Sequence, residues 1–377
     1  MKMLTIFWLS IISIFYTYLG YPLILFIVSL FRQTKVKRDT NYLPSVTLII
    51  TVHNEESRIK EKIKNTLELD YPRDRLQIIF ASDASTDSTD DIVTSYADRG
   101  INLVRQPMRK GKESAQKYAI EQASGDIIVF TDVATMLEKD SIKNIVSNFA
   151  DPSVGCVSSE DRFIDEHGNL SGEGFYVKYE MWLRSLESKV NSVVGLSGSF
   201  FAARKEICTD WPIDIPSDFN TLLNSIKLGF RGISDPLSIG IYKNIKNEKK
   251  EFMRKVRTIT RGISALMANM GLLNPMHYGI FSWQLISHKL MRWKVPFFML
   301  TALFTSIYLA LRSGFFRLVL LAELAFYALA GLGYRATSIH PIFKIPYYFV
   351  QANLAASYAW IKYFKGERFT TWTPSNR

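Results

Sequence analysis

Acidic residues follow three apolar, β-branched segments of this chain, and their spacing suggests a shared site. Glu55 comes just after the first segment, Asp83 after the second, and Asp132 ends a third. If these segments are parallel strands, their carboxyl ends meet at one edge of the sheet, where ligands bind. Carboxylates gathered there repel one another unless a cation or hydrogen-bond donors are present. A nucleoside diphosphate with Mg²⁺ would satisfy that requirement.

A second interpretation is that each acid only caps the helix that follows, as Asp87 could before Ser88. Other chemistries lack their motifs. No glycine-rich dinucleotide or P-loop signature follows any of these segments, and no nucleophile elbow occurs. The five histidines are too dispersed for a zinc site. The only cysteines, Cys156 and Cys208, cannot form a disulfide framework, so we expect the catalytic part to lie in a reducing compartment.

The segments that position these acids predict an α/β fold between Leu43 and about Asn247. The expected strands are Ser45–Thr51, Leu76–Ser82, Ile101–Arg105 and Asp126–Asp132. The expected helices are Glu56–Leu69, Ser88–Arg99, Lys112–Ala123, Lys139–Phe149 and Phe175–Val190. Unbroken apolar strands suit a sheet covered on both faces, so a mainly parallel sheet with crossover helices is the expected topology.

The amino-terminal segment predicts a membrane anchor. The chain has 377 residues, of which 47% are hydrophobic, and a formal charge of +11. Met3–Phe31 is nearly free of charge and long enough to cross a bilayer, whereas Arg32, Lys35, Lys37 and Arg38 follow at once. The positive-inside rule then places the next residues in the cytosol. The basic excess lies beside apolar segments, which favours anionic lipid over nucleic acid as its partner.

Three further apolar stretches lie near the other end, at Val295–Leu311, Phe315–Tyr334 and Ile345–Phe364. Three spans would place the C-terminus outside, yet basic residues near it favour the cytosol. The last stretch is therefore a candidate for a re-entrant or interfacial segment, and the topology stays open. Glu251–Arg292 mixes basic and apolar residues, as interfacial helices do. The expected divisions are an anchor at 1–32, the α/β domain at 43–247, interfacial helices at 248–293, carboxyl-terminal helices at 294–366 and a tail at 367–377.

An ordered series of motifs resembles one known family. The motifs are VTLIITVHNEE, SDASTDST, RKGKESAQKYAI, DIIVFTDVAT, GLSGSFFAARKEI, DIPSDFNTLLNSIKLGFRG, EFMRKVRTITRG and SHKLMRW. Together they extend over about Ser45 to Trp293 and are similar to the membrane-bound inverting glycosyltransferases of family 2. That resemblance implies a GT-A fold and a nucleoside diphosphate sugar as donor, with a UDP-sugar as the expected one.

The resemblance also implies a nucleotide pocket. Asp83 takes the place of the carboxylate that accepts a hydrogen bond from the nucleobase. His53 stands where an aromatic ring stacks on the base, although it could also be an ordinary surface residue. Thr51 and Glu55 border the same pocket.

For the diphosphate, the resemblance implies one metal-binding carboxylate and one lysine. Asp132 is the expected ligand of Mg²⁺ or Mn²⁺. Ala134 replaces the second acid of the fuller family pattern, which leaves Thr135 as a contributor through water. Lys112 would reach a phosphate from the start of its helix, or else is a solvated helix residue.

Catalysis by inversion requires one base for the acceptor hydroxyl and cations for the leaving diphosphate. The resemblance assigns the base to Asp218, with Asp214 as a nearby competitor. Arg254 and Arg257 correspond to a basic pair that holds the diphosphate, but lipid headgroup attraction explains them almost equally well. The family's Trp is absent after this pair, where Thr258 stands.

The expected acceptor side includes Trp182 with its neighbours Tyr179 and Glu180, although an aromatic stripe at helical spacing is also typical of a core. Gly198, between Ser197 and Ser199, permits close approach of a sugar or simply makes a tight turn. The sequence thus predicts a metal-dependent glycosyltransferase at the cytosolic membrane face, acting on a lipid-linked or growing glycan. The alternative is a catalytically silent, nucleotide-sugar-binding membrane subunit, which Ala134 favours.

Overall fold

The computed structural model describes residues 1–164, 175–243, 248–335 and 341–369. It divides into two compact units. The helical unit contains Met1–Ile27, Asn247–Ser264 and Ser282–Arg368. The α/β unit contains Val28–Lys246, Ala265–Phe281 and Phe369–Arg377.

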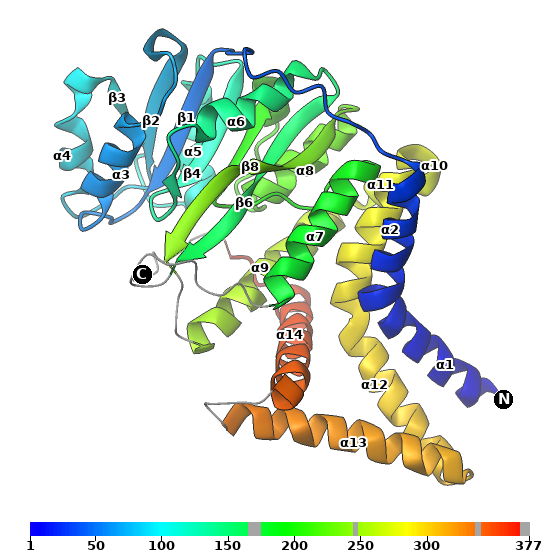
Figure 1. Ribbon diagram of the computed structural model, residues 1–377. Helices are drawn as coiled ribbons and strands as arrows, with labels where there is room; N and C mark the ends of the chain where they lie inside the picture. Colours follow the sequence, from blue (N-terminus) through cyan, green and yellow to red (C-terminus); the bar gives the residue numbers. More distant parts are fainter. Residues whose placement is uncertain (165–174, 244–247, 336–340, 370–377) are drawn as a thin grey trace. The chain divides into compact units, whose positions relative to one another are not determined.

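One eight-stranded sheet organises the α/β unit, in the order β3-β2-β1-β4-β7-β6-β8-β5 (Figure 1). Its first half consists of β1 (Val46–Val52), β2 (Leu76–Ser82), β3 (Ile101–Arg105) and β4 (Ile127–Asp132). All pairings within this half are parallel, and its four strands match the four expected ones to within one residue at each end. Every residue of β1 is buried, as an unbroken apolar strand covered on both faces requires.

The second half of the sheet departs from a parallel arrangement. It consists of β5 (Met136–Leu137), β6 (Val154–Ile164), β7 (Phe200–Arg204) and β8 (Arg231–Lys243). Strand β7 runs antiparallel to both β4 and β6, and β5 runs antiparallel to β8. Only β6 and β8 pair in parallel, and their register shifts twice. The sheet is therefore mixed, with most of its pairings parallel.

The helices of the α/β unit bury apolar side chains in its core, apart from the short α10 (Pro275–Tyr278), which has no buried residue. The others are α3 (Ile59–Leu67), α4 (Thr89–Thr94), α5 (Lys112–Glu121), α6 (Ser141–Ser147), α7 (Phe175–Val190) and α8 (Ser217–Lys227). The five expected helices all form, although α4 is shorter than predicted because a 3₁₀ turn replaces its end. The core beneath them contains residues such as Leu48, Phe80 and Val129, none of them exposed.

The helical unit is built from helices, most of which are long and apolar. These are α1 (Lys2–Phe15), the amino-terminal part of α2 (Tyr21–Phe31), most of α9 (Glu248–Ala268), α11 (Ile280–Leu285), α12 (Met291–Ala310), α13 (Gly314–Arg335) and α14 (Pro341–Phe364). Five-residue π-helical turns join α1 to α2 and α11 to α12. The Trp283 Nε1 donates to the Tyr16 hydroxyl over 2.9 Å, and that hydroxyl lies 2.7 Å from the Ser287 hydroxyl. These contacts connect the π-helical turn after α1 with α11 and with the π-helical turn that follows α11.

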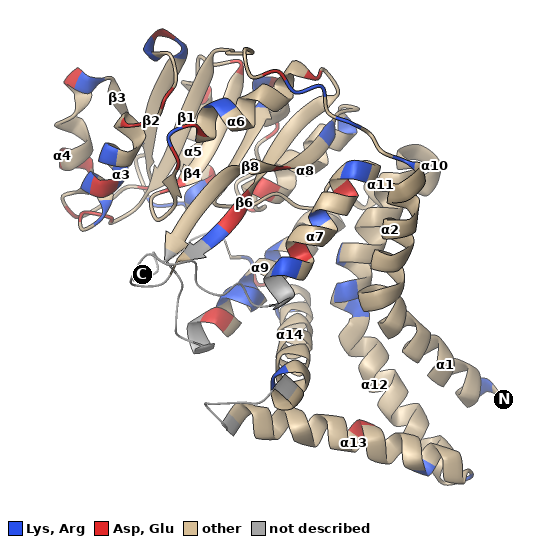
Figure 2. Cartoon of the chain, viewed as in Figure 1, with Lys and Arg blue, Asp and Glu red and all other residues tan. Residues whose placement is uncertain are grey.

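Three continuous helices are long and apolar enough to cross a membrane: Lys2–Phe31, Ile280–Ala310 and Gly314–Tyr334. Figure 2 shows how few charged residues α1, α2 and α13 carry. The second of these helices begins at Ile280, inside the segment expected to be interfacial, and continues into the stretch expected to span. Within the described residues, α14 does not meet the same test of length and hydropathy. Its role as a span or a re-entrant segment stays a prediction.

Candidate active site

The carboxyl ends of β1, β2 and β4 meet at one edge of the sheet. Thr51 on β1 pairs with Ala81 on β2 and with Asp132 on β4, and Asp83 directly follows β2. This common edge is what the sequence predicted from parallel strands. The two acids nevertheless meet different surroundings there.

Asp83 is fully buried and bound to the loop that precedes α5. Its Oδ1 accepts from the backbone N–H of Lys110 at 2.9 Å and of Gly111 at 3.0 Å, and also from the Gln106 side chain. Gly111 has φ +105°, a conformation that favours glycine. Asp83 thus fixes the loop from which Lys112 extends. Its expected contact with a nucleobase stays a prediction.

Lys112 connects the two halves of the sheet. Its ammonium donates to Asp132 Oδ1 over 2.5 Å and to the Gly198 carbonyl over 2.9 Å. Asp132 is half exposed, and its backbone N–H donates to the Ser199 carbonyl. The metal-binding carboxylate of the prediction is therefore paired with the expected phosphate-binding lysine.

Gly198 also approaches the predicted base. A Cβ added to Gly198 would lie 3.3 Å from Asp218 Oδ2, so the backbone here passes close beside that carboxylate. Asp218 lies in the first turn of α8 and is partly exposed. Within the described part of the chain, its carboxylate has neither a hydrogen bond nor an ion pair. The competitor Asp214 is exposed.

Glu113, next to Lys112, reaches the same helix. Its side chain is buried, and its Oε1 accepts from the Ser217 N–H over 3.5 Å at the start of α8. The Glu113 backbone carbonyl accepts from Trp211 Nε1 over 3.1 Å. Of these two consecutive residues of α5, Lys112 therefore contacts the end of β4 and the Gly198 loop, and Glu113 contacts the start of α8. The sequence analysis did not identify Glu113, because its partner is a backbone group.

The predicted nucleotide-pocket residues on β1 and after it are buried. The Oγ1 of Thr51 has no hydrogen-bond partner among the described residues. His53 Nδ1 lies 2.8 Å from the Asp83 carbonyl. Glu55 accepts from Arg58, but burial raises the pKa of Glu55 more than Arg58 lowers it. The structure thus gathers these three residues around the end of β2, and their roles toward a nucleotide stay predictions.

The remaining predicted residues lie on α7 and, in the other unit, on α9. Trp182 is 43% exposed on α7, and its ring centroid lies 6.3 Å from that of Tyr179. Arg254 lies on α9 in the helical unit and pairs with Glu251 over 2.8 Å. Arg257 lies on the same helix. The contact of this arginine pair with a diphosphate stays a prediction.

A buried lysine lies beneath the Asp132 turn and was missed. Lys62 on α3 has no exposed surface, and its Nζ donates to the Thr135 carbonyl. It also lies 3.4 Å from the Thr131 hydroxyl. Burial lowers the pKa of Lys62 to about 7, although the Asp132 charge acts in the opposite direction. The sequence did contain a signal for its burial. Lys62 stands three residues after Ile59 and therefore lies on the apolar face of α3.

A second cluster missed by sequence analysis surrounds Gly198. Asp161 on β6 accepts from Ser197 over 2.6 Å and from Ser199 over 3.2 Å. The Ser199 hydroxyl also lies 3.2 Å from the Tyr242 hydroxyl. Burial and the Asp161 charge raise the pKa of Tyr242 well above its usual range. These contacts hold the Gly198 loop against β6 and β8.

These residues fit a cation that a diphosphate also binds. In the described residues no group of three His, Cys, Asp or Glu side chains could hold a metal ion by itself. Ala134 offers no ligand, and one oxygen of Asp132 is taken by Lys112. Mg²⁺ commonly needs only one or two carboxylates when phosphates and waters complete its shell.

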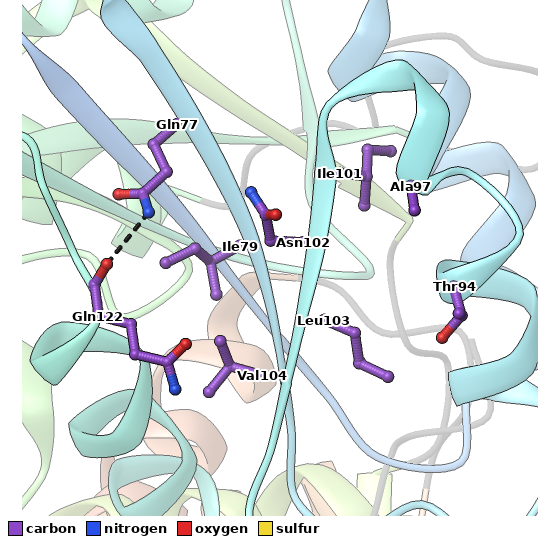
Figure 3. Close-up of a pocket in the computed structure, with 9 residues that line it drawn as sticks. All are labelled: Gln77, Ile79, Thr94, Ala97, Ile101, Asn102, Leu103, Val104 and Gln122. Carbon is purple, nitrogen blue, oxygen red and sulfur yellow. Dashed lines mark hydrogen bonds between the residues drawn. The ribbon is translucent and has the colours of Figure 1, made fainter.

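A separate hollow of about 460 Å³ lies between β2, β3 and α4 (Figure 3). The Gln77 side chain donates to the Gln122 carbonyl across it over 3.1 Å. The predicted site residues do not line it.

The family model for Glycosyl transferase family 2 matches residues 47–210. The chain is 28% identical over 182 residues to the "Probable glycosyltransferase YdaM" of Bacillus subtilis (strain 168), covering 46% of this chain and 43% of that protein. It is 26% identical over 206 residues to the "Poly-beta-1,6-N-acetyl-D-glucosamine synthase" of Staphylococcus aureus (strain COL), covering 52% and 49%. The chain therefore spans about half the length of the relatives it matches.

One solved structure shares the fold over nearly the whole chain. It is the "Mannosyltransferase PcManGT from Pyrobaculum calidifontis in complex with GDP-Man and Mn2+", with a TM-score of 0.76 and 23% identity over 96% of this chain and 99% of that one. At this identity the likeness establishes the fold, which is GT-A-like. The family match extends over residues 47–210, so this part of the chain is similar to glycosyltransferase family 2 domains.

Proposed function

We propose that this protein transfers a sugar from a nucleoside diphosphate sugar to a lipid-linked or growing glycan acceptor, with inversion, at the cytosolic face of a membrane. The observation that supports this most is the continuous set of contacts from Asp132 through Lys112 to Gly198, beside Asp218. The Lys112 ammonium could serve as a cation for a leaving diphosphate, and the Asp218 carboxylate, which has no protein partner among the described residues, lies beside the same glycine.

In this mechanism Asp218 is the general base. Its carboxylate takes the proton of the acceptor hydroxyl, and the acceptor oxygen forms a bond to the anomeric carbon of the donor. The bond from that carbon to the phosphate oxygen breaks, and the nucleoside diphosphate leaves with the electron pair. The attack and departure occur on opposite faces of the sugar, which inverts the anomeric configuration. A positioned base contributes about 10²- to 10⁴-fold to such a step.

Lys112 and the arginine pair would bind the leaving diphosphate. The Lys112 ammonium, within reach of both Asp132 and Gly198, would donate to a phosphate oxygen. Arg254 and Arg257 would add bidentate contacts. Asp132 would hold Mg²⁺ or Mn²⁺, which supplies further charge to stabilise the diphosphate. Thr51, His53, Glu55 and Asp83 would surround the nucleoside, and Trp182 with Gly198 would border the acceptor.

The similar proteins support the donor class and leave its identity open. The name of one relative specifies a poly-N-acetylglucosamine synthase, and the solved neighbour was determined with GDP-Man. A UDP-sugar, our first expectation, and a GDP-sugar are therefore both to be tested. The three apolar helices support an acceptor presented at a membrane. The basic residues after Phe31 support a cytosolic domain.

The test uses the full chain in detergent with a panel of nucleoside diphosphate sugars and Mn²⁺. A true donor should raise the melting temperature, because it binds only the folded state, and should release nucleoside diphosphate on turnover. Asp218→Asn should reduce that turnover by about 10²- to 10⁴-fold, whereas the matched Asp214→Asn should retain it. Binding of a donor without turnover in any variant would instead support the silent subunit. If no donor binds, the proposal is wrong.

A further inference from the structure

The Lys112 ammonium occupies one oxygen of the carboxylate that a divalent cation would use. It donates to Asp132 Oδ1 over 2.5 Å and to the Gly198 carbonyl over 2.9 Å. Only 18% of the Lys112 side chain is exposed. The loop before α5 is fixed by Asp83 through Gly111, so the lysine extends from an anchored start. This is a built ion pair and not a loose surface contact.

The surroundings of Asp132 include a second amine and one further acid, Glu55, whose pKa the Asp132 charge helps to raise. Lys62 brings a second amine to the same turn from beneath, where it donates to the Thr135 carbonyl. Ala134 leaves the turn without the second carboxylate that would balance these lysines. Around this turn, the Lys112 ammonium already pairs with the Asp132 carboxylate, and position 134 supplies no second acid. Such a balance disfavours an additional dication.

Lys112 and a dication would crowd each other on one carboxylate. A bound Mg²⁺ lies about 2.1 Å from its oxygen ligands, which would place it within a few ångströms of the Lys112 ammonium. Repulsion at such a distance is strong where the site is partly buried. A diphosphate relieves this conflict, because it offers Lys112 another anionic acceptor and offers the cation further oxygen ligands.

We propose that Lys112 and a divalent cation compete for Asp132, so that the cation binds only after a nucleoside diphosphate draws Lys112 away. This inference rests on the proposed function, since it assumes a diphosphate at this site. In the absence of nucleotide, Lys112 would prevent Asp132 from binding divalent cations. The nucleotide and the cation therefore enter together or in the order nucleotide first.

The test measures Mn²⁺ binding to the full chain in detergent by electron paramagnetic resonance, without nucleotide. The wild type should bind Mn²⁺ weakly, and Lys112→Met should bind it about tenfold more tightly, because a close charge repulsion is removed. Lys117→Met, which removes an exposed lysine from the same helix, should behave as the wild type. Asp132→Asn in the Lys112→Met background should abolish the gain. Equal Mn²⁺ affinity in the wild type and Lys112→Met would overturn the proposal.

A second variant keeps the test valid if Lys112→Met fails to fold. Ala134→Asp adds the missing carboxylate, and it should tighten Mn²⁺ binding without nucleotide while leaving Lys112 in place. Adding UDP or GDP to the wild type should then increase its Mn²⁺ affinity, and Lys112→Met should lose most of that increase. If Lys112→Met tightens Mn²⁺ binding but no nucleotide binds to any variant, the competition stands and the proposed function fails. If nucleotide binds and Lys112→Met leaves Mn²⁺ affinity unchanged, the competition is refuted and the proposed function stands.

Discussion

The acids at the two halves of the sheet differ in burial and in hydrogen bonding. In the first half, Asp83 is fully buried and accepts hydrogen bonds from the loop before α5. Beside the second half, Asp218 is partly exposed, with no partner for its carboxylate in the part of the chain that the structure describes. An acid whose hydrogen bonds are satisfied stabilises the fold, whereas an unengaged one is available to a substrate. The same residue type therefore serves as a scaffold in one half and as a candidate base in the other.

This difference between Asp83 and Asp218 should have its largest effect on the free energy of unfolding. Asp83→Asn keeps the shape of the side chain but removes the charge that holds Gly111 and Lys110, so we expect a loss of about 2 to 4 kcal/mol in the free energy of unfolding. Asp218→Asn should change it by less than about 0.5 kcal/mol. Thermal unfolding of both variants in detergent measures this. Equal losses would show that Asp218 has structural partners after all.

A second measurement examines the buried lysine of the first half. The folded-state pKa of Lys62 is about 7 and its ordinary value is 10.5. At pH 7 and below, folding therefore buries a charge, and this penalty declines as the pH rises toward 10.5. Lys62→Met should remove at most about 5 kcal/mol of that penalty near pH 7, offset by about 1 kcal/mol for the lost hydrogen bond to Thr135. Its advantage should disappear near pH 10.

The melting temperatures of Lys62→Met and the wild type, compared from pH 7 to pH 10, provide the measurement. Lys64→Met, an exposed lysine on the same helix, should show no such pH dependence. A constant difference between Lys62→Met and the wild type across this range would contradict a buried, weakly protonated amine.

The smallest expected effect concerns the link between the halves. Glu113 accepts from the Ser217 N–H at the start of α8 and so helps to orient Asp218. Glu113→Gln weakens that contact by removing its charge, and kcat should fall about fivefold, while the KM for the donor stays the same. The exposed Glu121→Gln on α5 is the matched control. A changed KM with constant kcat would assign Glu113 to donor binding and not to the base.

The first half of the sheet was predictable because each of its strands is encoded by a short, continuous segment of the sequence. Four apolar segments, each ended by polar residues, determined the strands, and the parallel topology determined that Glu55, Asp83 and Asp132 approach one edge. The same argument applied to the end of β3 would have found Gln106, which contacts Asp83. Strand β7 was not predicted, since Phe200–Arg204 was considered only as part of the motif GLSGSFFAARKEI.

What the sequence alone determined is the set of elements and the residue types at their ends, because hydrophobic periodicity acts within a few residues. Only the tertiary structure decided which of these acids already has a hydrogen-bond or ion-pair partner in the protein. Asp83 is satisfied by backbone groups 27 and 28 residues later in the chain, and Asp132 by a lysine 20 residues away. Such partners come together only when the sheet and α5 pack, since a hydrogen bond depends on positions in space and not on spacing in the sequence.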